Sequence, residues 1–375
     1  MKPKTRFILE KLAQIKKANL YRTLEYNKIS GPYITINGKK LFNLSSNDYL
    51  GITSTYNVSQ IQSSSRLIAG NDYSFKELED KLAKHKSKSS ALVFPTGYMA
   101  NLGAISILTQ KNDVILSDEL NHASIIDACR LSYAKKLVYK HNDVSDLEKK
   151  LRKKAHHKFV ITEGIFSMNG DFARLKEITK LCQENNAFLI LDDAHGDFVA
   201  GRDGKGSADH FRVAKNVDIY ISSLSKALGT FGGYMTANKE IIDLAVNTSR
   251  PFIYTSALPG FLADLALKRF LTNREKKRLG LWKKIEQFSK GLRSIGYTIE
   301  SQSQIIPIII GDERKTLEFG KYLRNNKVFA QPIRYPTVNL GSARIRISVT
   351  DWLSENMISE SLDVFEKAGK KFGIT

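Results

Sequence analysis

Three stretches of this chain combine residue types that could carry out chemistry. The apolar run 187–191 (AFLIL) ends in 192–195 (DDAH), which puts ionisable groups at the end of a predicted strand. The run 218–221 (DIYI) leads through three serines to Lys226, among small residues where burial could activate an amine. The stretch 94–101 (FPTGYMAN) predicts a strand, a glycine turn and a helix N-terminus, whose free N–H groups suit a phosphate.

Pyridoxal phosphate needs this combination of groups. Asp192 could keep the pyridine nitrogen protonated, Lys226 could hold the aldehyde as a Schiff base, and the helix N-terminus could bind the phosphate. Each stretch also has a simpler interpretation, since strand-end caps and surface lysines are common. The order of the three stretches along the chain nevertheless suits the large aspartate-aminotransferase-like fold.

Motifs of other enzyme classes are absent from the sequence. There is no Walker A loop, GxGxxG fingerprint, GxSxG or HExxH, which argues against a nucleoside triphosphatase, a Rossmann dehydrogenase, a serine hydrolase and a zinc protease. Two cysteines, Cys129 and Cys182, are too few for a disulfide framework or a thiolate zinc site, and a cytoplasmic location fits best.

The histidines named next lie outside these stretches and are predicted to have no role in the chemistry. His85, His141 and His210 lie in polar or basic surroundings and are expected to face solvent. The adjacent His156 and His157 are expected to point apart, without a suitably spaced carboxylate, so we predict no metal.

Short apolar runs alternate with helical patterns through the middle of the chain, as in a parallel sheet covered on both faces, and predict strands at 91–94, 114–116, 158–161, 187–191 and 218–221. Further strands are predicted near 305–310, 328–333 and 343–349, with helices at 313–325 and 353–370. The predicted fold class is therefore α/β, with a large sheet domain and a smaller C-terminal α/β domain. We predict an N-terminal helix with short strands over 1–45, a large domain over 46–265, and a linker helix with the small domain over 266–375.

Positive charge dominates the composition, with 58 Lys and Arg against 38 Asp and Glu, a net charge of +20. No nucleic-acid recognition motif accompanies it, so a solvated lysine-rich surface is the preferred interpretation, and an acidic carrier partner stays open. The apolar runs fall far short of the ~20 residues that a bilayer span needs, so no membrane partner is predicted.

Longer segments resemble the α-oxoamine synthase family of pyridoxal-phosphate enzymes, which have the fold type I of aspartate aminotransferase. The matching segments span nearly the whole chain in family order: 45–52 (SSNDYLGI), 94–101, 117–132 (SDELNHASIIDACRLS), 141–151 (HNDVSDLEKKL), 161–171 (ITEGIFSMNGD), 191–207 (LDDAHGDFVAGRDGKGS), 222–233 (SSLSKALGTFGG), 253–259 (IYTSALP) and 336–348 (PTVNLGSARIRIS). One stretch departs from the family, because serines replace a glycine-rich GSGGSR-like segment just before Arg66, so the backbone there is not expected to follow it.

The resemblance implies a role for each matching residue. Lys226 would bind the cofactor and move the Cα proton, Asp192 would pair with the pyridinium nitrogen, and His195 would bond the phenolic oxygen, with His122 stacked on the ring. The other implied cofactor contacts are Gly97, Tyr98, Ser167 and Ser223, with Thr255 and Ser256 reaching the phosphate of the neighbouring subunit in a homodimer. Implied substrate contacts are Arg22, Asn47, His122, Thr337 and Arg346, with Arg344 as the alternative to Arg346 for a substrate carboxylate.

The implied reaction is the decarboxylative condensation of an amino acid with an acyl thioester. Segments 141–151 and 336–346 favour the branch that joins L-alanine to a pimeloyl thioester, giving 8-amino-7-oxononanoate for biotin biosynthesis, with coenzyme A or an acyl carrier protein as carrier. Alternatives within the family use glycine or another acyl group, as 2-amino-3-ketobutyrate ligase, 5-aminolevulinate synthase and long-chain aminoketone synthases do. An alternative from another class is a basic binding protein that retains an inactive enzyme fold.

Overall fold

The computed structural model describes residues 13–21, 27–52 and 64–375, which form two compact units. The large unit comprises 47–167 and 171–279, within its described parts. The small unit comprises the chain up to residue 46, the short insert 168–170, and 280–375. No helix in the described part of the chain is both long enough and apolar enough to cross a membrane.

The predicted domain boundaries differ from these units in two places. The N-terminal segment was predicted as a separate element, but β3 (Lys39–Asn43) pairs in parallel with β12 (Val328–Phe329), which joins that segment to the C-terminal part. The boundary predicted at 265/266 falls inside α10 (Gly260–Leu271). That helix packs against α2 (Tyr73–His85) and therefore belongs to the large unit.

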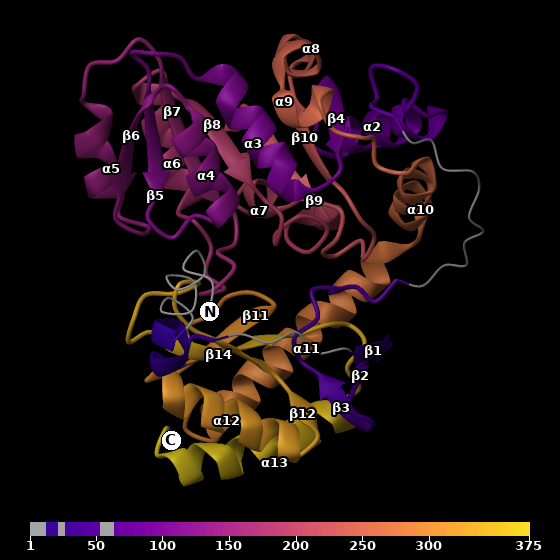
Figure 1. Ribbon diagram of the computed structural model, residues 1–375, viewed down its shortest axis with the longest axis vertical. Coiled ribbons are helices and arrows are strands. Elements are labelled where there is room, and N and C mark those ends of the chain that lie inside the picture. Colours follow the sequence, from indigo (N-terminus) through magenta and orange to yellow (C-terminus); the bar gives the residue numbers. More distant parts are fainter. Residues whose placement is uncertain (1–12, 22–26, 53–63) are drawn as a thin grey trace, which may run out of the picture. The chain divides into compact units, whose positions relative to one another are not determined.

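A seven-stranded sheet forms the centre of the large unit (Figure 1). Its strands, in spatial order, are β4 (Ser90–Phe94), β10 (Gly233–Ala237), β9 (Ile219–Ser223), β8 (Phe188–Asp192), β7 (Lys158–Glu163), β5 (Val114–Asp118) and β6 (Lys135–Tyr139). The five strands from β9 to β6 are parallel, whereas β10 pairs antiparallel with both of its neighbours. Apolar runs in the sequence predicted β4, β5, β7, β8 and β9, whereas β6 and β10 were not predicted.

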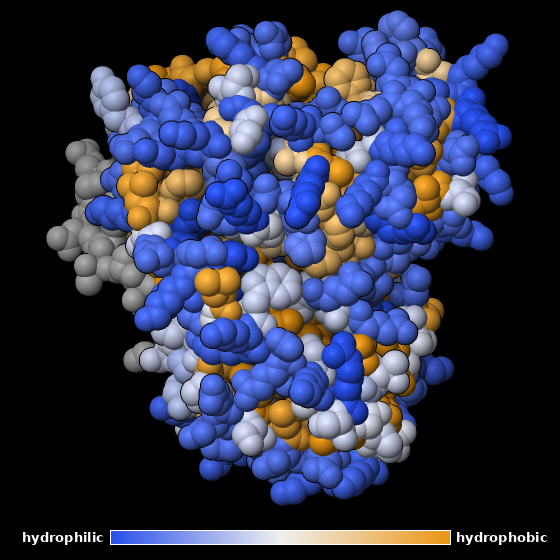
Figure 2. Space-filling model, turned by 180° about the vertical axis from the view of Figure 1, so that it is seen from behind, coloured by the Kyte–Doolittle hydropathy of each residue, from blue (hydrophilic) through white to orange (hydrophobic). Residues whose placement is uncertain are grey.

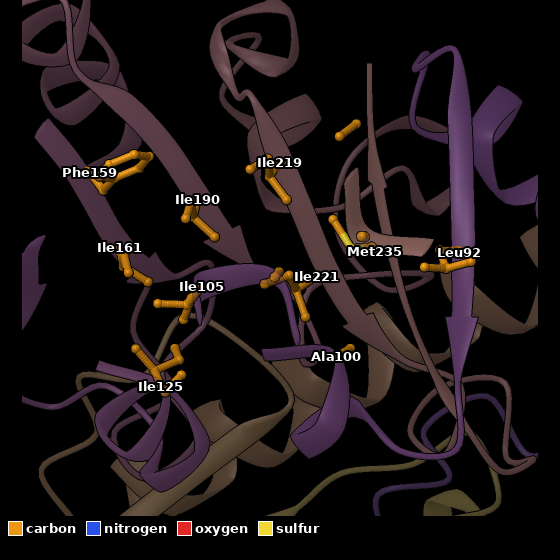
Figure 3. Packing of buried hydrophobic residues seen from close by; sticks show 14 of the residues in the cluster. Leu92, Ala100, Ile105, Ile125, Phe159, Ile161, Ile190, Ile219, Ile221 and Met235 are labelled. Carbon is orange, nitrogen blue, oxygen red and sulfur yellow. The ribbon is translucent and has the colours of Figure 1, made fainter. Parts of the chain in front are cut away.

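Helices cover both faces of this sheet, which explains why its strands read as continuous apolar runs. One face packs against α3 (Gly97–Leu108), α4 (Ala123–Leu131), α8 (Lys239–Thr248) and α9 (Arg250–Ile253). The other face packs against α5 (Val144–Leu151), α6 (Leu175–Glu184) and α7 (Ser207–His210), near 3₁₀ turns at Arg202–Gly204 and Ala214–Asn216. Figure 3 shows the first face, where Ile190 of β8 and Ile161 of β7 lie near Ile105 of α3.

The small unit contains two further sheets. The first has the order β1 (Asn27–Ser30), β2 (Tyr33–Ile36), β3, β12, and the second has the order β11 (Ile305–Gly311), β14 (Ala343–Ser348), β13 (Gln331–Ile333). Two helices, α12 (Glu313–Asn325) and α13 (Glu355–Phe372), pack against each other, and α11 (Arg274–Ser294) contains the junction between the units. The predicted helix 313–325 corresponds to α12, and the predicted strands near 305–310 and 343–349 correspond to β11 and β14.

Hydrophilic residues predominate on the surface shown in Figure 2, where hydrophobic residues form small groups.

Two histidines that were predicted to face solvent do not. His85 is buried, stacked on the ring of Phe198 at 4.9 Å. His141 is half-buried between two carboxylates, with Nδ1 3.0 Å from Asp118 Oδ1 and Nε2 2.8 Å from Asp171 Oδ2. Their polar sequence neighbours gave the wrong indication, because tertiary contacts decide burial.

The His141 ion pairs predict a pH-dependent stability. Burial alone would lower the pKa of His141, but its hydrogen bonds to Asp118 and Asp171 outweigh burial and raise the pKa to about 10. The stabilisation is therefore complete below the ordinary pKa of 6.5 and is lost as the pH rises towards 10. We expect His141→Asn to lower the free energy of unfolding at pH 6 by about 2 kcal/mol, between values typical of exposed and buried ion pairs.

Chemical denaturation of the wild type and His141→Asn at pH 6 and pH 10 measures this difference. The exposed His210 provides the matched control, and His210→Asn should change the free energy of unfolding little at either pH. A gap between wild type and His141→Asn that is the same size at both pH values would contradict the prediction.

Candidate active site

The carboxyl ends of β7, β8 and β9 meet the N-terminus of α3 around a cavity of about 190 Å³ in the large unit. This is the edge of the sheet at which open α/β proteins bind ligands. The residues that line the cavity are Thr96, Gly97, Tyr98, Asn101, His122, Ser124, Glu163, Asp192, Ala194, His195, Ile221, Ser222, Ser223, Ser225 and Lys226. Seven residues predicted from the sequence are therefore brought together: Gly97, Tyr98, His122, Asp192, His195, Ser223 and Lys226.

Asp192 is the last residue of β8, and its carboxylate is buried. Oδ2 accepts a hydrogen bond from Asn101 Nδ2 at 2.6 Å, and Oδ1 accepts one from the Ala194 N–H at 3.0 Å. The neighbouring Asp193 lies on the opposite side of the strand, where both of its oxygens accept from the Ser207 N–H. Side chains alternate between the two faces of an extended strand, which accounts for this difference between the two aspartates.

A hydrogen-bonded chain links Asp192 to His122. The other N–H of Asn101 Nδ2 donates to Ser124 Oγ at 3.0 Å, and that hydroxyl lies 2.8 Å from His122 Nδ1. The Ser124 N–H also donates to Nδ1, so the neutral ring carries its proton on Nε2. Burial, aided by the charge of Lys226, lowers the pKa of His122 although Asp192 opposes the shift, so the ring is neutral at pH 7.

Lys226 lies in the loop of a hairpin between β9 and the antiparallel β10. Backbone hydrogen bonds close this loop at its base, from Leu224 N–H to the Gly232 carbonyl and from Thr230 N–H to the Leu224 carbonyl, both 3.0 Å. Ser223 Oγ, at the end of β9, lies 2.7 Å from Ser225 Oγ. Lys226 is half-buried in this loop and lines the cavity together with Asp192 and His122.

The N-terminus of α3 forms another wall. Thr96 caps the helix by accepting from the Met99 N–H at 3.1 Å, and helix geometry leaves the N–H groups of Gly97 and Tyr98 without intrahelical acceptors. A Cβ at Gly97 would lie 3.2 Å from Ser223 Cβ, so glycine allows the helix to approach β9 closely. A phosphate group fits the donors at this helix end.

His195 follows Asp192 by three residues, in a tight turn. Its Nδ1 lies 2.8 Å from the hydroxyl of Tyr49, which in turn donates to Asn47 Oδ1 at 3.0 Å. Asn47, a predicted substrate contact, is thus connected to the cavity through Tyr49. Ser167 is buried beside the cavity, and its N–H donates to Glu163 Oε2 at 3.3 Å.

The sequence analysis missed Glu163, Asn101 and Ser124. Glu163 ends β7, and burial, reinforced by the charge of Asp192, raises the pKa of its carboxyl group well above the usual range, which favours the neutral form. A longer strand than the predicted run 158–161 would have placed Glu163 at the same sheet edge as Asp192. Asn101 lies four residues after Gly97, one helical turn along the same face, which is the signal that could have identified it.

The other predicted residues within the described ranges do not line this cavity. Thr255 is half-buried and Ser256 exposed in the large unit, and Arg22 lies outside the described residues, as does most of the departing stretch, 53–63. Thr337, Arg344 and Arg346 belong to the small unit.

Arg344 and Arg346 are both buried on β14 and differ in their partners. Arg344 donates to three oxygens of the small unit: the Ser342 carbonyl at 3.1 Å, the Met168 carbonyl at 3.2 Å and Asn169 Oδ1 at 2.6 Å. Arg346 donates to Ser348 Oγ at 3.0 Å. Among the described residues, the hydrogen-bond partners of Arg344 are neutral oxygens rather than carboxylates, and burial lowers the pKa of its guanidinium group.

One expectation about the histidine pair was wrong. His156 and His157 do not point apart, since their ring centroids are 4.2 Å apart and their Nδ1 atoms lie 3.9 and 3.0 Å from Asp113 Oδ1. Asp113 is buried, and its carboxylate also accepts a hydrogen bond from the His157 backbone N–H at 3.0 Å. This carboxylate therefore stabilises the local backbone. Within the described ranges, Asp113, His156 and His157 form a group whose possible ligand atoms lie close enough together to hold a metal ion. Both histidines of this group are exposed.

Comparison with known proteins places this geometry in a family. The family model for aminotransferase class I and II matches residues 39–364. The 8-amino-7-oxononanoate synthase of Thermoanaerobacter pseudethanolicus is 42% identical over 98% of both chains, and that of Treponema denticola is 39% identical over 98% of both.

Solved structures agree with this family. A serine palmitoyltransferase of S. paucimobilis with a bound PLP–myriocin aldimine is 26% identical, with a TM-score of 0.92 over 99% of both chains. An 8-amino-7-oxononanoate synthase of Francisella tularensis is 28% identical, with a TM-score of 0.76 over 88% of this chain and 98% of its own. This chain therefore belongs to the aminotransferase class I and II family of pyridoxal-phosphate enzymes with fold type I, and within that family it groups with the 8-amino-7-oxononanoate synthases.

Proposed function

We propose that this chain condenses L-alanine with a pimeloyl thioester, with loss of CO2, to give 8-amino-7-oxononanoate and the free thiol of the carrier. The observation that carries the proposal is the cavity in which Lys226, Asp192 and His122 come together, in a chain about 40% identical to synthases of that name. Such a reaction belongs to biotin biosynthesis, and a cytoplasmic location remains part of the proposal.

The residues of the cavity fit pyridoxal phosphate. The donors at the α3 N-terminus would bind the phosphate, Lys226 would hold the aldehyde carbon, and Asp192 would face the pyridine nitrogen, with His195 near the phenolic oxygen. Asn101 and the Ala194 N–H hold the Asp192 carboxylate in place. When bound, this cofactor supplies an electron sink for the negative charge that develops at the amino-acid Cα.

The residues of this chain would handle the protons. Lys226 Nζ would take the Cα proton of alanine and return a proton to the product. His122 Nε2–H would donate to the thioester carbonyl oxygen or to the departing carboxylate, because Nδ1 is already occupied by the Ser124 N–H. Arg346 would hold a substrate carboxylate, since the donors of Arg344 already serve oxygens of the small unit. Thr337, Asn47 and Arg22 remain proposed substrate contacts.

A homodimer forms part of this proposal. Thr255 and Ser256 are absent from the cavity lining of their own chain, within the described residues, and Ser256 is exposed. This arrangement supports the implied role of both residues at the cofactor phosphate of a partner subunit. Coenzyme A or an acyl carrier protein would present the acyl group, and both are acidic partners for a chain of net charge +20.

A substrate matrix tests the function. Purified protein with pyridoxal phosphate is assayed with alanine, glycine and serine against pimeloyl, acetyl, succinyl and palmitoyl thioesters, with mass spectrometry of the products. We expect alanine with the pimeloyl thioester to give the highest kcat/KM, by at least about tenfold. Preference for glycine or palmitoyl thioester would assign the chain to a related reaction, and no visible cofactor absorbance would indicate a binding protein.

Lys226 is predicted to be the residue that binds the cofactor covalently. Lys226→Ala should lose the visible absorbance of the lysine-bound cofactor and nearly all turnover, because no other lysine lines the cavity among the described residues. Borohydride reduction of the wild-type enzyme followed by peptide mapping checks the position. Recovery of the reduced pyridoxyl group on a different lysine would overturn the assignment.

Two buried carboxyl groups in the same cavity are predicted to differ in importance. Asp192→Asn removes the negative charge at the pyridine nitrogen and should lower kcat by about 100-fold or more. Glu163→Gln replaces a carboxyl group whose neutral form burial favours, so kcat should stay within about threefold of wild type. Steady-state kinetics of the two isosteric variants measures the contrast, and equal losses would refute it.

The two arginines of β14 provide a further prediction. Lysine cannot reproduce the planar, two-pronged contact of arginine with a carboxylate, so Arg346→Lys should raise the KM for alanine by about tenfold or more. Arg344→Lys is the matched control and should act mainly on thermal stability, because its partners are protein oxygens. A raised KM in Arg344→Lys together with an unchanged KM in Arg346→Lys would transfer the role.

A further inference from the structure

A buried lysine lies beside the active site but does not line its cavity. Lys86 directly follows α2, and only 1% of its side chain is exposed. Its Nζ lies 2.7 Å from Asp197 Oδ1 and 3.3 Å from Asp193 Oδ2, and it donates to the Lys205 carbonyl at 2.9 Å. Both carboxylates are equally buried, so three charged side chains meet in the interior.

The two carboxylates stand at the two ends of the turn that holds His195. The N–H groups of Gly196 and Asp197 donate to the Asp193 carbonyl at 3.0 and 2.8 Å, and the Asp193 N–H donates to the Ile221 carbonyl of β9 at 2.8 Å. Through Asp193 and Asp197, Lys86 therefore holds both ends of this turn.

Asp197 also connects Lys86 to β9. Its Oδ2 accepts from Ser222 Oγ at 2.8 Å and from the Tyr234 hydroxyl. Ser222 lines the cavity and directly precedes Ser223, which lines it too. One buried ammonium group is thus linked to two walls of the cavity, the His195 turn and the end of β9.

The charges of this cluster depend on Lys86. Burial would raise the pKa of Asp197, but Lys86 and His85 outweigh burial and lower it, whereas burial raises the pKa of Asp193 to about 6. His85 Nε2 lies 3.3 Å from Asp197 Oδ1, and burial lowers the pKa of that ring. Arg274 lies near enough to interact with Asp197. Without the Lys86 charge, two buried carboxylates in one turn would lose their shared counter-ion.

We infer that Lys86 is a positioning residue, which sets the geometry of His195 and Ser223 by holding Asp193 and Asp197. The inference rests on the proposed function only in taking this cavity as the cofactor site. It predicts that Lys86, without touching the cofactor, controls how tightly the cofactor binds and how fast the reaction proceeds.

Lys88 provides a matched control two residues along the same stretch. Its Nζ donates to the Val217 carbonyl and has no carboxylate within ion-pair distance in the described part of the chain. The Lys86→Met and Lys88→Met variants are compared by fluorescence titration of the apoenzymes with pyridoxal phosphate, by steady-state kinetics, and by thermal unfolding. The assays are run at a temperature where circular dichroism shows both variants folded.

Lys86→Met should bind pyridoxal phosphate at least tenfold more weakly and show a kcat at least tenfold lower, with the KM for alanine within threefold of wild type. Lys88→Met should stay within twofold of wild type in all three quantities. A Lys86→Met variant that matches Lys88→Met in cofactor affinity and kcat would overturn the inference.

A double variant separates positioning from folding. Lys86→Met with Asp193→Asn removes one of the two carboxylates that lose their partner, and should recover thermal stability relative to Lys86→Met while cofactor affinity stays low. Recovery of cofactor affinity together with stability would show a purely structural role and refute the inference. The cofactor titration needs no substrate, so a wild-type enzyme that binds the cofactor but condenses no thioester would refute the proposed function alone.

Discussion

The buried carboxylate of Asp192 is the interaction on which the rest of the site depends. A charged group with almost no exposure to water needs hydrogen-bond partners, because burying it unpaired is very costly. Asn101 and the Ala194 N–H supply them, and Asn101 passes the constraint on to Ser124 and His122. The orientation of His122, at the N-terminus of α4, therefore follows from the need to satisfy a carboxylate at the end of β8.

A second group of buried charges is formed by Lys86, Asp193 and Asp197, and Asp193 directly follows Asp192 in the sequence. Alternation along β8 turns Asp192 towards the cavity and Asp193 into the interior, where Lys86 and Asp197 meet it. His195 lies in the turn between Asp193 and Asp197, and its Nδ1 contacts the hydroxyl of Tyr49. Two consecutive acidic residues thus lie in two different environments: Asp192 lines the cavity, and Asp193 holds the turn that contains His195.

The sequence predicted seven of the fifteen residues that line the cavity, because the ends of buried strands can be recognised in it. Apolar runs in 187–191 and 218–221 marked strands buried on both faces, so the polar residues after them had to lie at one edge of the sheet. Strand β6 was missed because it begins with two lysines, and β10 because it lies in a glycine-rich stretch. His85 was misjudged because its basic sequence neighbours suggest a surface, whereas burial there depends on Phe198, more than a hundred residues away in the sequence.

The hairpin that carries Lys226 has a consequence for how related sequences can diverge. Ser223 and Gly233 face each other in register, and backbone bonds at 224 and 232 close the loop between them. An inserted or deleted residue would shift that register, and with a side-chain period of two it would turn one strand's inward residues outward. Apart from Lys226 and the positive-φ residues Gly229 and Gly232, the side chains of the loop 224–232 can therefore change far more readily during evolution than the length of the loop.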